Sequence, residues 1–213
     1  MKLYSFFRSS AAYRMRIALN LKGLPYEMDY VSLPKMEQRK PEFLALNPQG
    51  LVPALIDGDD VLIQSMAIIE YLDETHPTAP RFIPGNPLDR AYVRALSQVV
   101  ACETHPLNNV RVLNYLRDAL KADDAARQAW YEHWIELGLG TVESLLKRKG
   151  KMGRFCYGDS PTMADICLVP QVFNAQRFNC PTDPYPTVMK IFEACQAMKP
   201  FADAHPSTQK DAV

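Results

Sequence analysis

The chain has 213 residues, a length that suits one large domain or two small ones. Its 24 basic and 24 acidic side chains cancel, which argues against nucleic acid or a membrane surface as a bulk partner. No apolar stretch approaches the roughly 18 residues that span a bilayer. The first strand-like run follows Met1 without a leader pattern, so we expect a soluble, cytoplasmic protein.

Strand and helix signals alternate over the first part of the chain. The apolar run Lys2–Phe7 predicts a strand, and Ala11–Lys22 predicts a helix that Gly23 ends. Tyr26–Leu33 alternates as a second strand, and Pro41–Leu46 predicts a short helix with proline at an allowed early position.

Two more strands and a helix follow. Pro53–Asp57 and Val61–Gln64 flank the turn signal at residues 57–60, which indicates a hairpin. Ser65–His76 predicts a helix whose first residue can cap it. The order of these elements favours a small mixed sheet with helices packed on it.

A connector rich in proline comes next, with Pro77, Pro80, Pro84 and Pro87. Beyond it the apolar residues recur only at helical spacing. We therefore expect an α/β domain over residues 1–80 and an all-helical domain over residues 88–213. The polar residues Pro206–Val213 are expected to fray.

The five cysteines all lie in the later part of the chain. None forms a C-x-x-C pair, their number is odd, and no cluster of histidine and cysteine has metal-ligand spacing. We expect reduced, mostly buried thiols, with Cys102 in the core, and no bound metal.

Two serines stand where the first strand ends and the first helix begins. Free backbone N–H groups and the helix dipole favour negative charge there, and the hydroxyls of Ser9 and Ser10 add movable donors. A plain N-cap is the alternative, since serine is among the best capping residues. If the bound anion is a thiolate, the chain is an enzyme that uses the sulfur of a separate molecule bound at this site.

Two further segments suit a peptide-like ligand. The Val52-Pro53 bond could be cis, and the backbone of Val52 could pair with a ligand as an added strand. Gln64 and Ser65 place an amide and a hydroxyl at a second helix N-terminus, which suits a ligand carboxylate. An ordinary loop and an ordinary cap are the alternatives.

Thr162 and Asp165 have the spacing of a capping box ahead of an apolar run. The threonine side chain can bond the Asp165 N–H, and the carboxylate can reach back to the Thr162 N–H. We expect a structural role for this pair.

Taken together, these motifs resemble the zeta class of glutathione transferases, the maleylacetoacetate isomerase family, over essentially the whole chain. The resemblance rests on Phe7-Arg8-Ser9-Ser10 with Arg14-x-Arg16-Ile17-Ala18-Leu19, Asn47-Pro48 with Val52-Pro53, Gln64-Ser65-x-Ala67-Ile68-Ile69-Glu70-Tyr71-Leu72, Gly158-Asp159 with Thr162-x-Ala164-Asp165, and Leu168-Val169-Pro170-Gln171-Val172. It implies a thioredoxin-like first domain, an all-helical second domain and a homodimer. Ser9-Ser10-Ala11-Ala12 stands where thioredoxin-like proteins carry C-x-x-C, so the redox sulfurs are absent.

The resemblance also assigns roles to individual residues. The expected catalytic residues are Ser9, Ser10 and Arg8, with the Ser9 hydroxyl stabilising a glutathione thiolate. Glutathione would be bound by Ser9, Ser10, Ala11, Gln38, Val52, Gln64, Ser65, His105 and Asn109, and substrate carboxylates by Arg8, Arg111 and Arg177. On local evidence alone, Arg111 and Arg177 could be ordinary surface charges and His105 could fill a kink before Pro106. We expect Arg14 and Arg16 to form structural ion pairs or to be exposed to solvent.

The implied activity is glutathione-dependent cis–trans isomerisation of a maleyl keto acid, maleylacetoacetate, to its fumaryl isomer in aromatic degradation. Thiolate addition, rotation and elimination would leave glutathione unchanged as a cofactor. The alternatives are maleylpyruvate isomerisation, glutathione transfer to α-halo acids or other electrophiles, and a non-catalytic interaction module of the same fold.

Two residues depart from the family pattern. Ala11 stands where the motif often has a cysteine, so we do not expect reductive dehalogenation, which relies on that thiol. Arg111 stands where some maleylacetoacetate isomerases have an uncharged residue, and an arginine there resembles the maleylpyruvate isomerase branch.

Overall fold

The computed structural model describes residues 1–78 and 80–212. The chain divides into two compact units, one formed by Met1–Phe82 with Gln196–Val213 and the other by Ile83–Cys195. The sequence predicted domains at 1–80 and 88–213. The observed division differs in that the residues from Gln196 onward group with the first unit.

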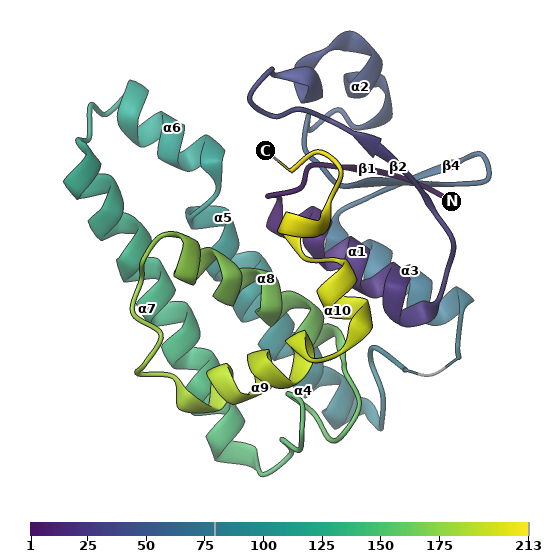
Figure 1. Cartoon of the computed structure of the whole chain (residues 1–213). Coiled ribbons are helices and arrows are strands. Elements are labelled where there is room, and N and C mark those ends of the chain that lie inside the picture. Colours follow the sequence, from purple (N-terminus) through teal and green to yellow (C-terminus); the bar gives the residue numbers. More distant parts are fainter. Residues whose placement is uncertain (79, 213) are drawn as a thin grey trace. The chain divides into compact units, whose positions relative to one another are not determined.

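A four-stranded sheet in the order β2-β1-β3-β4 forms the centre of the first unit (Figure 1). Its strands are β1 (Lys2–Ser5), β2 (Glu27–Tyr30), β3 (Ala54–Asp57) and β4 (Asp60–Ile63). Strand β1 pairs parallel with β2 and antiparallel with β3, and β3 forms the predicted hairpin with β4. Strands β1, β2 and β3 are shorter than the predicted runs, because pairing ends before the apolar pattern does, whereas β4 keeps the predicted length and begins one residue earlier, at Asp60.

Helices cover both faces of this sheet (Figure 1). Helices α1 (Ser10–Lys22) and α3 (Ser65–Thr75) lie side by side on one face, and α2 (Pro41–Leu46) lies over the other. Because side chains alternate along a strand, Leu3 is buried on the α1 side while Tyr4 makes an edge contact with Phe43 of α2 at 5.9 Å. Gly23 ends α1 in the left-handed conformation with φ 64°, as predicted.

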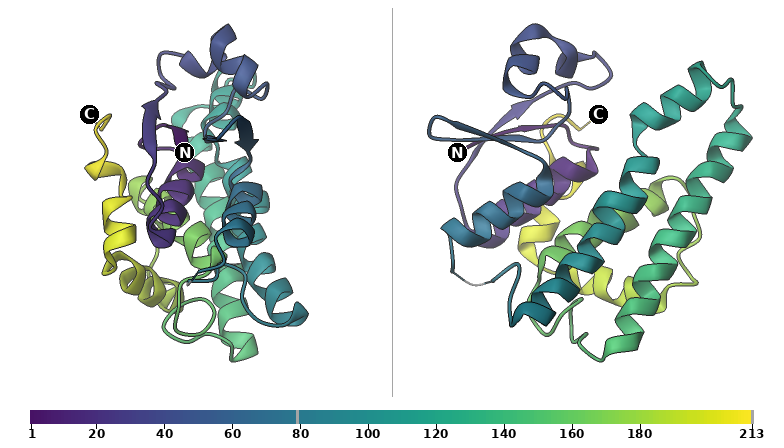
Figure 2. Two further views of the ribbon diagram at one scale, coloured as in Figure 1. Left: turned by 90° about the vertical axis from the view of Figure 1, so that its right-hand side faces the viewer. Right: turned by 180° about the vertical axis from the view of Figure 1, so that it is seen from behind.

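The regular secondary structure of the second unit is helical in its described part, apart from an isolated β-bridge between Met152 and Gly158 (Figure 2). It contains α4 (Pro87–Gln98), the π-helix η2 (Val99–Thr104), α5 (His105–Leu107), α6 (Val110–Asp118), α7 (Asp124–Lys149), α8 (Met163–Arg177) and most of α9 (Pro186–Gln196). Helix α8 is buried along almost its whole length, and α4 and η2 pack against it. The predicted capping box begins α8: Asp165 Oδ2 accepts hydrogen bonds from the Thr162 N–H at 2.8 Å and the Thr162 hydroxyl at 3.0 Å.

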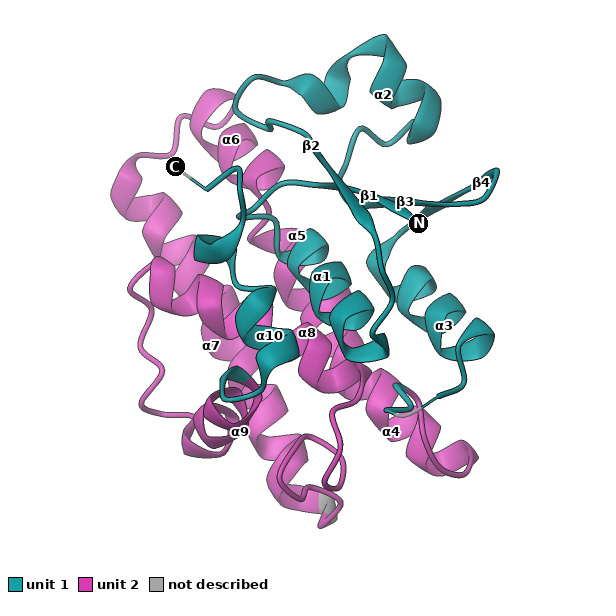
Figure 3. Cartoon of the chain, turned by 45° about the vertical axis from the view of Figure 1, so that its right-hand side comes forward, with its two compact units in different colours: residues 1–82, 196–213 teal, residues 83–195 magenta. Residues whose placement is uncertain are grey.

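The C-terminal segment packs on the first unit (Figure 3). It includes α10 (Lys199–Asp203) and a 3-10 turn, η3 (Pro206–Thr208). The prediction that Pro206–Val213 frays is wrong for its described residues, because the carboxylate of Asp211 accepts a hydrogen bond from the Phe7 N–H. Val213 lies outside the described residues.

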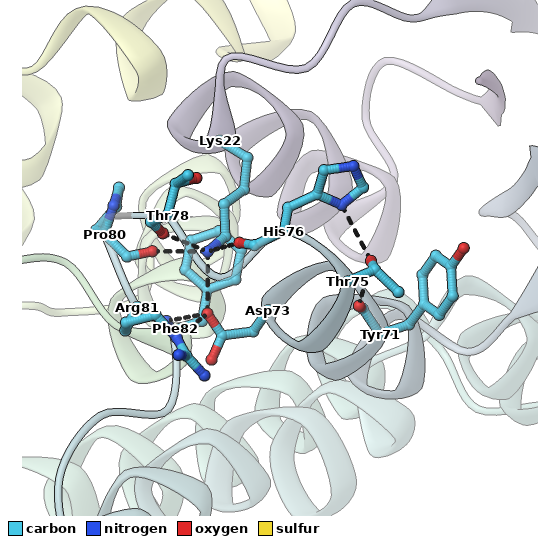
Figure 4. A network of polar contacts seen from close by, with 9 residues as sticks. All are labelled: Lys22, Tyr71, Asp73, Thr75, His76, Thr78, Pro80, Arg81 and Phe82. Atoms are coloured by element: carbon cyan, nitrogen blue, oxygen red, sulfur yellow. Dashed lines mark hydrogen bonds and ion pairs between the residues drawn. The ribbon is translucent and has the colours of Figure 1, made fainter.

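A buried ammonium group holds the start of the connector against α1 and α3 (Figure 4). The Lys22 side chain is fully buried, and its Nζ lies 3.0 Å from the Asp73 carboxylate. The same Nζ donates to the carbonyl oxygens of His76, Thr78 and Pro80 at 2.8–2.9 Å. Because an unpaired buried charge is costly, this network fixes the chain that leaves α3.

The sequence also led to expectations about membrane spans, metal sites and cysteines, on which the described residues give information. Among these residues, no helix is long and apolar enough to cross a membrane, and no group of three or more histidine, cysteine or acidic side chains lies together as a metal site would require. Four cysteines are buried and free, but Cys102 is exposed on η2, so the expectation that it lies in the core is wrong.

Candidate active site

Ser9 is the N-cap of α1. Its backbone is extended, with φ −70°, and its Oγ accepts a hydrogen bond from the Ala12 N–H at 3.2 Å. This cap uses a lone pair of the hydroxyl oxygen and leaves the hydroxyl proton able to donate. The two interpretations of Ser9, as a cap and as a donor to an anion, are therefore compatible.

The start of α1 is suited to negative charge. No acidic residue lies in its first turn, and the backbone N–H of Ala11 makes no hydrogen bond to another described residue. Ser10 is buried and Ser9 is half-buried. The partial positive charge of the helix N-terminus is therefore not neutralised by a carboxylate within the first turn of the helix.

Arg8 provides a full positive charge next to these serines. Its side chain is exposed, and its guanidinium carbon lies 4.8 Å from the centre of the Phe7 ring and 5.8 Å from that of Phe6. It forms no ion pair with any described residue. The charge of Arg8 is thus held over aromatic rings and remains able to bind an anionic ligand.

The loop before β3 presents an unpaired peptide group. Asn47, which is 1% exposed, holds this loop by donating to the Leu51 carbonyl at 2.7 Å and accepting from the Gln49 N–H at 3.0 Å. The Val52-Pro53 bond is cis. The main-chain N–H and C=O of Val52 make no hydrogen bond to another described residue, so both can pair with an extended peptide ligand.

The start of α3 carries a strained residue followed by a buried hydroxyl. Gln64 has φ 70°, an uncommon conformation for a residue with a side chain, and its amide nitrogen donates to Gln49 Oε1 at 2.7 Å. Ser65 is buried, and its Oγ accepts a hydrogen bond from Arg14 Nη1 at 3.3 Å. The contact of Gln64 with Gln49 and that of Arg14 with Ser65 were not predictable from the sequence, because neither is visible in local patterns.

The sheet register brings these three segments to one end of the sheet. Tyr4, near the end of β1, pairs with Ala54, the first residue of β3, and Ala54 also pairs with Ile63, the last residue of β4. Ser9 follows β1, Val52 precedes β3, and Gln64 follows β4. The helix start at Ser9, the free peptide of Val52 and the helix start at Ser65 therefore face the same region of the first unit.

Gln38 lies in the 3-10 turn η1 (Glu37–Arg39), between β2 and α2. Its Nε2 lies 3.6 Å from Met36 Sδ, and its Oε1 is buried without a hydrogen bond from any described residue. A buried acceptor without a donor is rare in proteins, so a ligand N–H is a natural partner for it.

The remaining candidates belong to the second unit. His105 begins α5 directly after the π-helix, which accommodates the chain before Pro106. Asn109 caps α6, where its Oδ1 accepts from the Arg111 N–H at 3.1 Å. The Arg111 side chain is exposed and forms no ion pair with a described residue.

Arg177 lies at the C-terminal end of α8, and its guanidinium carbon is 4.6 Å from the centre of the Phe178 ring. Its side chain is exposed. The roles assigned to Arg177, Arg111, Asn109 and His105 stay predictions.

Comparisons with known proteins extend over the whole chain. Residues 3–81 match the family model for the N-terminal domain of glutathione S-transferases. The chain is 50% identical to a maleylpyruvate isomerase from Ralstonia sp, and the match covers 100% of both chains.

Solved structures of maleylpyruvate and maleylacetoacetate isomerases are also similar to this chain over its whole length. One similar structure is that of a maleylacetoacetate isomerase from Methylobacterium extorquens with bound malonate and glutathione. Its sequence is 43% identical to this chain, and the two structures superpose with a TM-score of 0.96. A holo structure of a zeta-class maleylpyruvate isomerase is 49% identical with a TM-score of 0.97. Both matches cover 100% of each chain.

Proposed function

From the chain's membership of the zeta class of glutathione transferases, which the full-length identity of 49% to a structure of that class establishes, we propose that it is a glutathione-dependent cis–trans isomerase of a maleyl keto acid. The product is the fumaryl isomer, and maleylacetoacetate is the first candidate substrate. The observation that carries the proposal is the start of α1, where the Ser9 hydroxyl keeps a proton to donate and the first turn of the helix contains no acidic residue.

The first unit fits glutathione as a cofactor. The free peptide group of Val52 suits the cysteinyl backbone, and the start of α3 at Gln64 and Ser65 suits the γ-glutamyl carboxylate. Ser9, Ser10 and the Ala11 N–H suit a thiolate. When bound, glutathione supplies a nucleophilic sulfur that adds to the cis double bond and is released unchanged after rotation.

The chain's own residues support this reaction by stabilising negative charge on glutathione and on the substrate. The Ser9 hydroxyl donates to the sulfur, and the field of the α1 N-terminus with Arg8 lowers the pKa of the bound thiol. Gln38, His105 and Asn109 complete the proposed glutathione-binding set. Arg8, Arg111 and Arg177 bind the substrate carboxylates and stabilise negative charge that develops on the keto oxygen.

Maleylpyruvate is the second candidate substrate. It carries a carboxylate next to its keto group, and Arg111 offers an exposed guanidinium without an ion-pair partner among the described residues. The relative from Ralstonia is a maleylpyruvate isomerase and supports the same choice. We further propose that the protein acts as a homodimer in the cytoplasm, which is what the family resemblance and the sequence predict.

The experiment that tests the proposal follows the ultraviolet absorbance of maleylpyruvate and of maleylacetone, a stable analogue of maleylacetoacetate, with and without glutathione. We expect loss of absorbance that depends on glutathione, with the fumaryl isomer as product. The ratio of kcat/KM for the two compounds ranks the candidate substrates. If glutathione binds but neither compound is isomerised, the proposed function is wrong and a transferase or a binding module replaces it.

A further inference from the structure

The last described residues reach the loop that leads to Ser9. Asp211 Oδ2 accepts a hydrogen bond from the backbone N–H of Phe7 at 2.9 Å, although the two residues are 204 positions apart. Phe7 lies two residues before Ser9, and the Ser9 N–H closes the intervening turn by donating to the Phe6 carbonyl at 2.9 Å. The C-terminal segment thus contacts the turn that presents the proposed catalytic serine.

A second charged side chain, that of Arg16, binds the carbonyl group of Phe7. Arg16 Nη2 donates to the Phe7 carbonyl at 3.0 Å, while its Nη1 donates to Ser5 Oγ at 3.2 Å and its Nε to the Ala204 carbonyl at 2.9 Å. The arginine is fully buried. Both main-chain polar groups of Phe7 are therefore bound by ionisable side chains, and one of these side chains belongs to the C-terminal segment.

The two charges support each other electrostatically. Burial lowers the pKa of Arg16 to about 10, and the nearby tyrosines and the carboxylate of Asp211 oppose that shift. Arg16 therefore remains a cation at neutral pH. Asp211 Oδ1 is buried and accepts no hydrogen bond from a described residue, so the bond to Phe7 is the one hydrogen bond of this carboxylate in the described chain, and its charge also faces Arg16 and Tyr30.

We propose that Asp211 is a positioning residue for the isomerase reaction: by fixing the Phe7 peptide, it sets the turn that places the Ser9 hydroxyl. This inference rests on the proposed function, because it assigns the Ser9 hydroxyl to the glutathione sulfur. Asp211 itself touches neither glutathione nor substrate in this proposal. Its effect reaches the sulfur through the turn.

The segment has other anchors, so a variant of Asp211 should still fold. Asn20 Nδ2 donates to the Pro200 carbonyl at 3.0 Å, and Gln196 Nε2 donates to the Tyr13 hydroxyl at 3.3 Å. The contact of Arg16 with Ala204 also remains. Removing the carboxylate of Asp211 therefore frees the Phe7 N–H without undocking α10.

The test compares three variants of the full chain. Asp211→Ala removes the acceptor, Asp211→Asn removes the charge but keeps an acceptor oxygen, and Asp203→Ala removes an exposed carboxylate of the same segment that pairs with Lys199 at 2.6 Å. We expect Asp211→Ala to lower kcat/KM about tenfold, the scale of a slightly misplaced catalytic group. Asp211→Asn should recover most of that loss, and Asp203→Ala should match the wild type.

The pKa of bound glutathione separates positioning from simple electrostatics. Removing a negative charge would by itself lower the thiol pKa, whereas a misplaced Ser9 hydroxyl would raise it. Titration of thiolate absorbance in the complex should therefore show a raised thiol pKa in Asp211→Ala. Faster hydrogen exchange at the Phe7 amide, with unchanged exchange in β1, should accompany it.

The proposal is overturned if Asp211→Ala keeps wild-type kcat/KM, if its thiol pKa falls, or if Asp203→Ala loses as much activity. An Asp211→Asn variant as impaired as Asp211→Ala would also overturn it. A wild-type protein that isomerises neither compound would refute the proposed function instead. In that case the thiol titration and the Phe7 exchange still decide whether Asp211 positions the turn.

Discussion

Arg14 Nη1 donates a hydrogen bond to the hydroxyl oxygen of Ser65 at 3.3 Å, which ties the body of α1 to the first residue of α3. Arg14 is 2% exposed, so its charge lies inside the first unit. The hydroxyl proton of Ser65 stays available to a ligand, because the arginine uses only an oxygen lone pair. The two helix starts proposed to bind glutathione are thus physically connected.

Arg14→Lys should weaken glutathione binding more than it slows the reaction. A lysine keeps the charge but loses the planar geometry that reaches the Ser65 oxygen. We expect the KM for glutathione to rise about fivefold, equivalent to about 1 kcal/mol, with kcat within about twofold of the wild type. Initial rates measured against glutathione concentration give both constants.

A double-mutant cycle with Ser65→Ala shows whether Arg14 acts through that hydroxyl. If it does, Arg14→Lys should add little to the effect of Ser65→Ala. Fully additive effects of the two substitutions would contradict the link between the two residues.

Ser9→Ala should lower kcat/KM by roughly 10²-fold, which is the scale for losing a preorganised donor to a charged group. The substitution also removes the cap on Ala12, so stability should fall by about 1 kcal/mol. Steady-state kinetics and thermal melts measure the two effects. A kinetic loss of only a few-fold would mean that Ser9 serves as a cap alone.

Ser9→Gly provides the control that separates these roles. Glycine is tolerated at the N-cap at a cost of a few tenths of a kcal/mol, but it has no hydroxyl. The glycine variant should therefore melt close to the wild type and be as inactive as the alanine variant. Recovery of activity in the glycine variant would be incompatible with a catalytic hydroxyl.

Features set by local patterns were predictable from the sequence. Gly23 ends α1 and the capping box at Asp165 begins α8, because both depend on residues a few positions apart. The helix N-terminus at Ser9 was equally visible. Its dual use, as a cap and as a potential donor, follows from the chemistry of a hydroxyl group.

Features that depend on distant contacts were not predictable. The polar composition of Pro206–Val213 indicated fraying, but a bond from Phe7 to Asp211, 204 positions away, orders the end of this segment. The link between Arg14 and Ser65 spans 51 positions and uses a side chain that was expected to form a structural ion pair or to be exposed to solvent. Such contacts depend on tertiary packing, and they cannot be inferred from the spacing of residues within a local motif.

Asp165→Ala should destabilise the second unit. The carboxylate accepts three hydrogen bonds, from the Thr162 N–H and hydroxyl and from the Cys156 N–H at 2.8 Å, and all of them are buried. Leaving these donors unsatisfied should cost about 3 kcal/mol. Chemical denaturation of the variant and the wild type measures the difference.

Asp165→Asn is the matched control for that substitution. Burial raises the pKa of Asp165, although the hydrogen bonds from Cys156 and Thr162 oppose the shift, so an uncharged isostere avoids part of the desolvation cost. The asparagine variant should lose clearly less stability than the alanine variant. Asparagine keeps one acceptor oxygen, but its amide nitrogen faces the other N–H donor. Equal losses would therefore mean that one acceptor oxygen does not stabilise the start of α8.

His205 should make the first unit less stable in mild acid. Burial and, to a smaller extent, the charge of Arg16 lower the pKa of His205 below its usual 6.5. Its Nδ1 lies 3.2 Å from the Ser207 N–H, which the neutral ring accepts as an N-cap. Protonation therefore costs more in the folded protein than in the unfolded chain.

The sign of the effect follows from proton linkage. Because the folded pKa lies below the unfolded one, the contribution of His205 to stability is complete above about pH 6.5 and is lost as the pH falls through the folded pKa. His205→Asn keeps a capping acceptor and does not titrate. Free energies of unfolding between pH 7.5 and 5.5 should fall more steeply for the wild type than for this variant, and parallel curves would exclude the effect.

Arg111→Ser should discriminate between the candidate substrates. If Arg111 binds the carboxylate beside the keto group, its loss should lower kcat/KM for maleylpyruvate by about tenfold or more and affect maleylacetone less, because only maleylpyruvate loses a charge-assisted hydrogen bond. Arg117→Ser is a suitable control, since Arg117 lies on the same helix and pairs with Asp118 at 2.7 Å. Equal losses for the two compounds would remove Arg111 from substrate selection, because a general change in α6 affects both reactions alike.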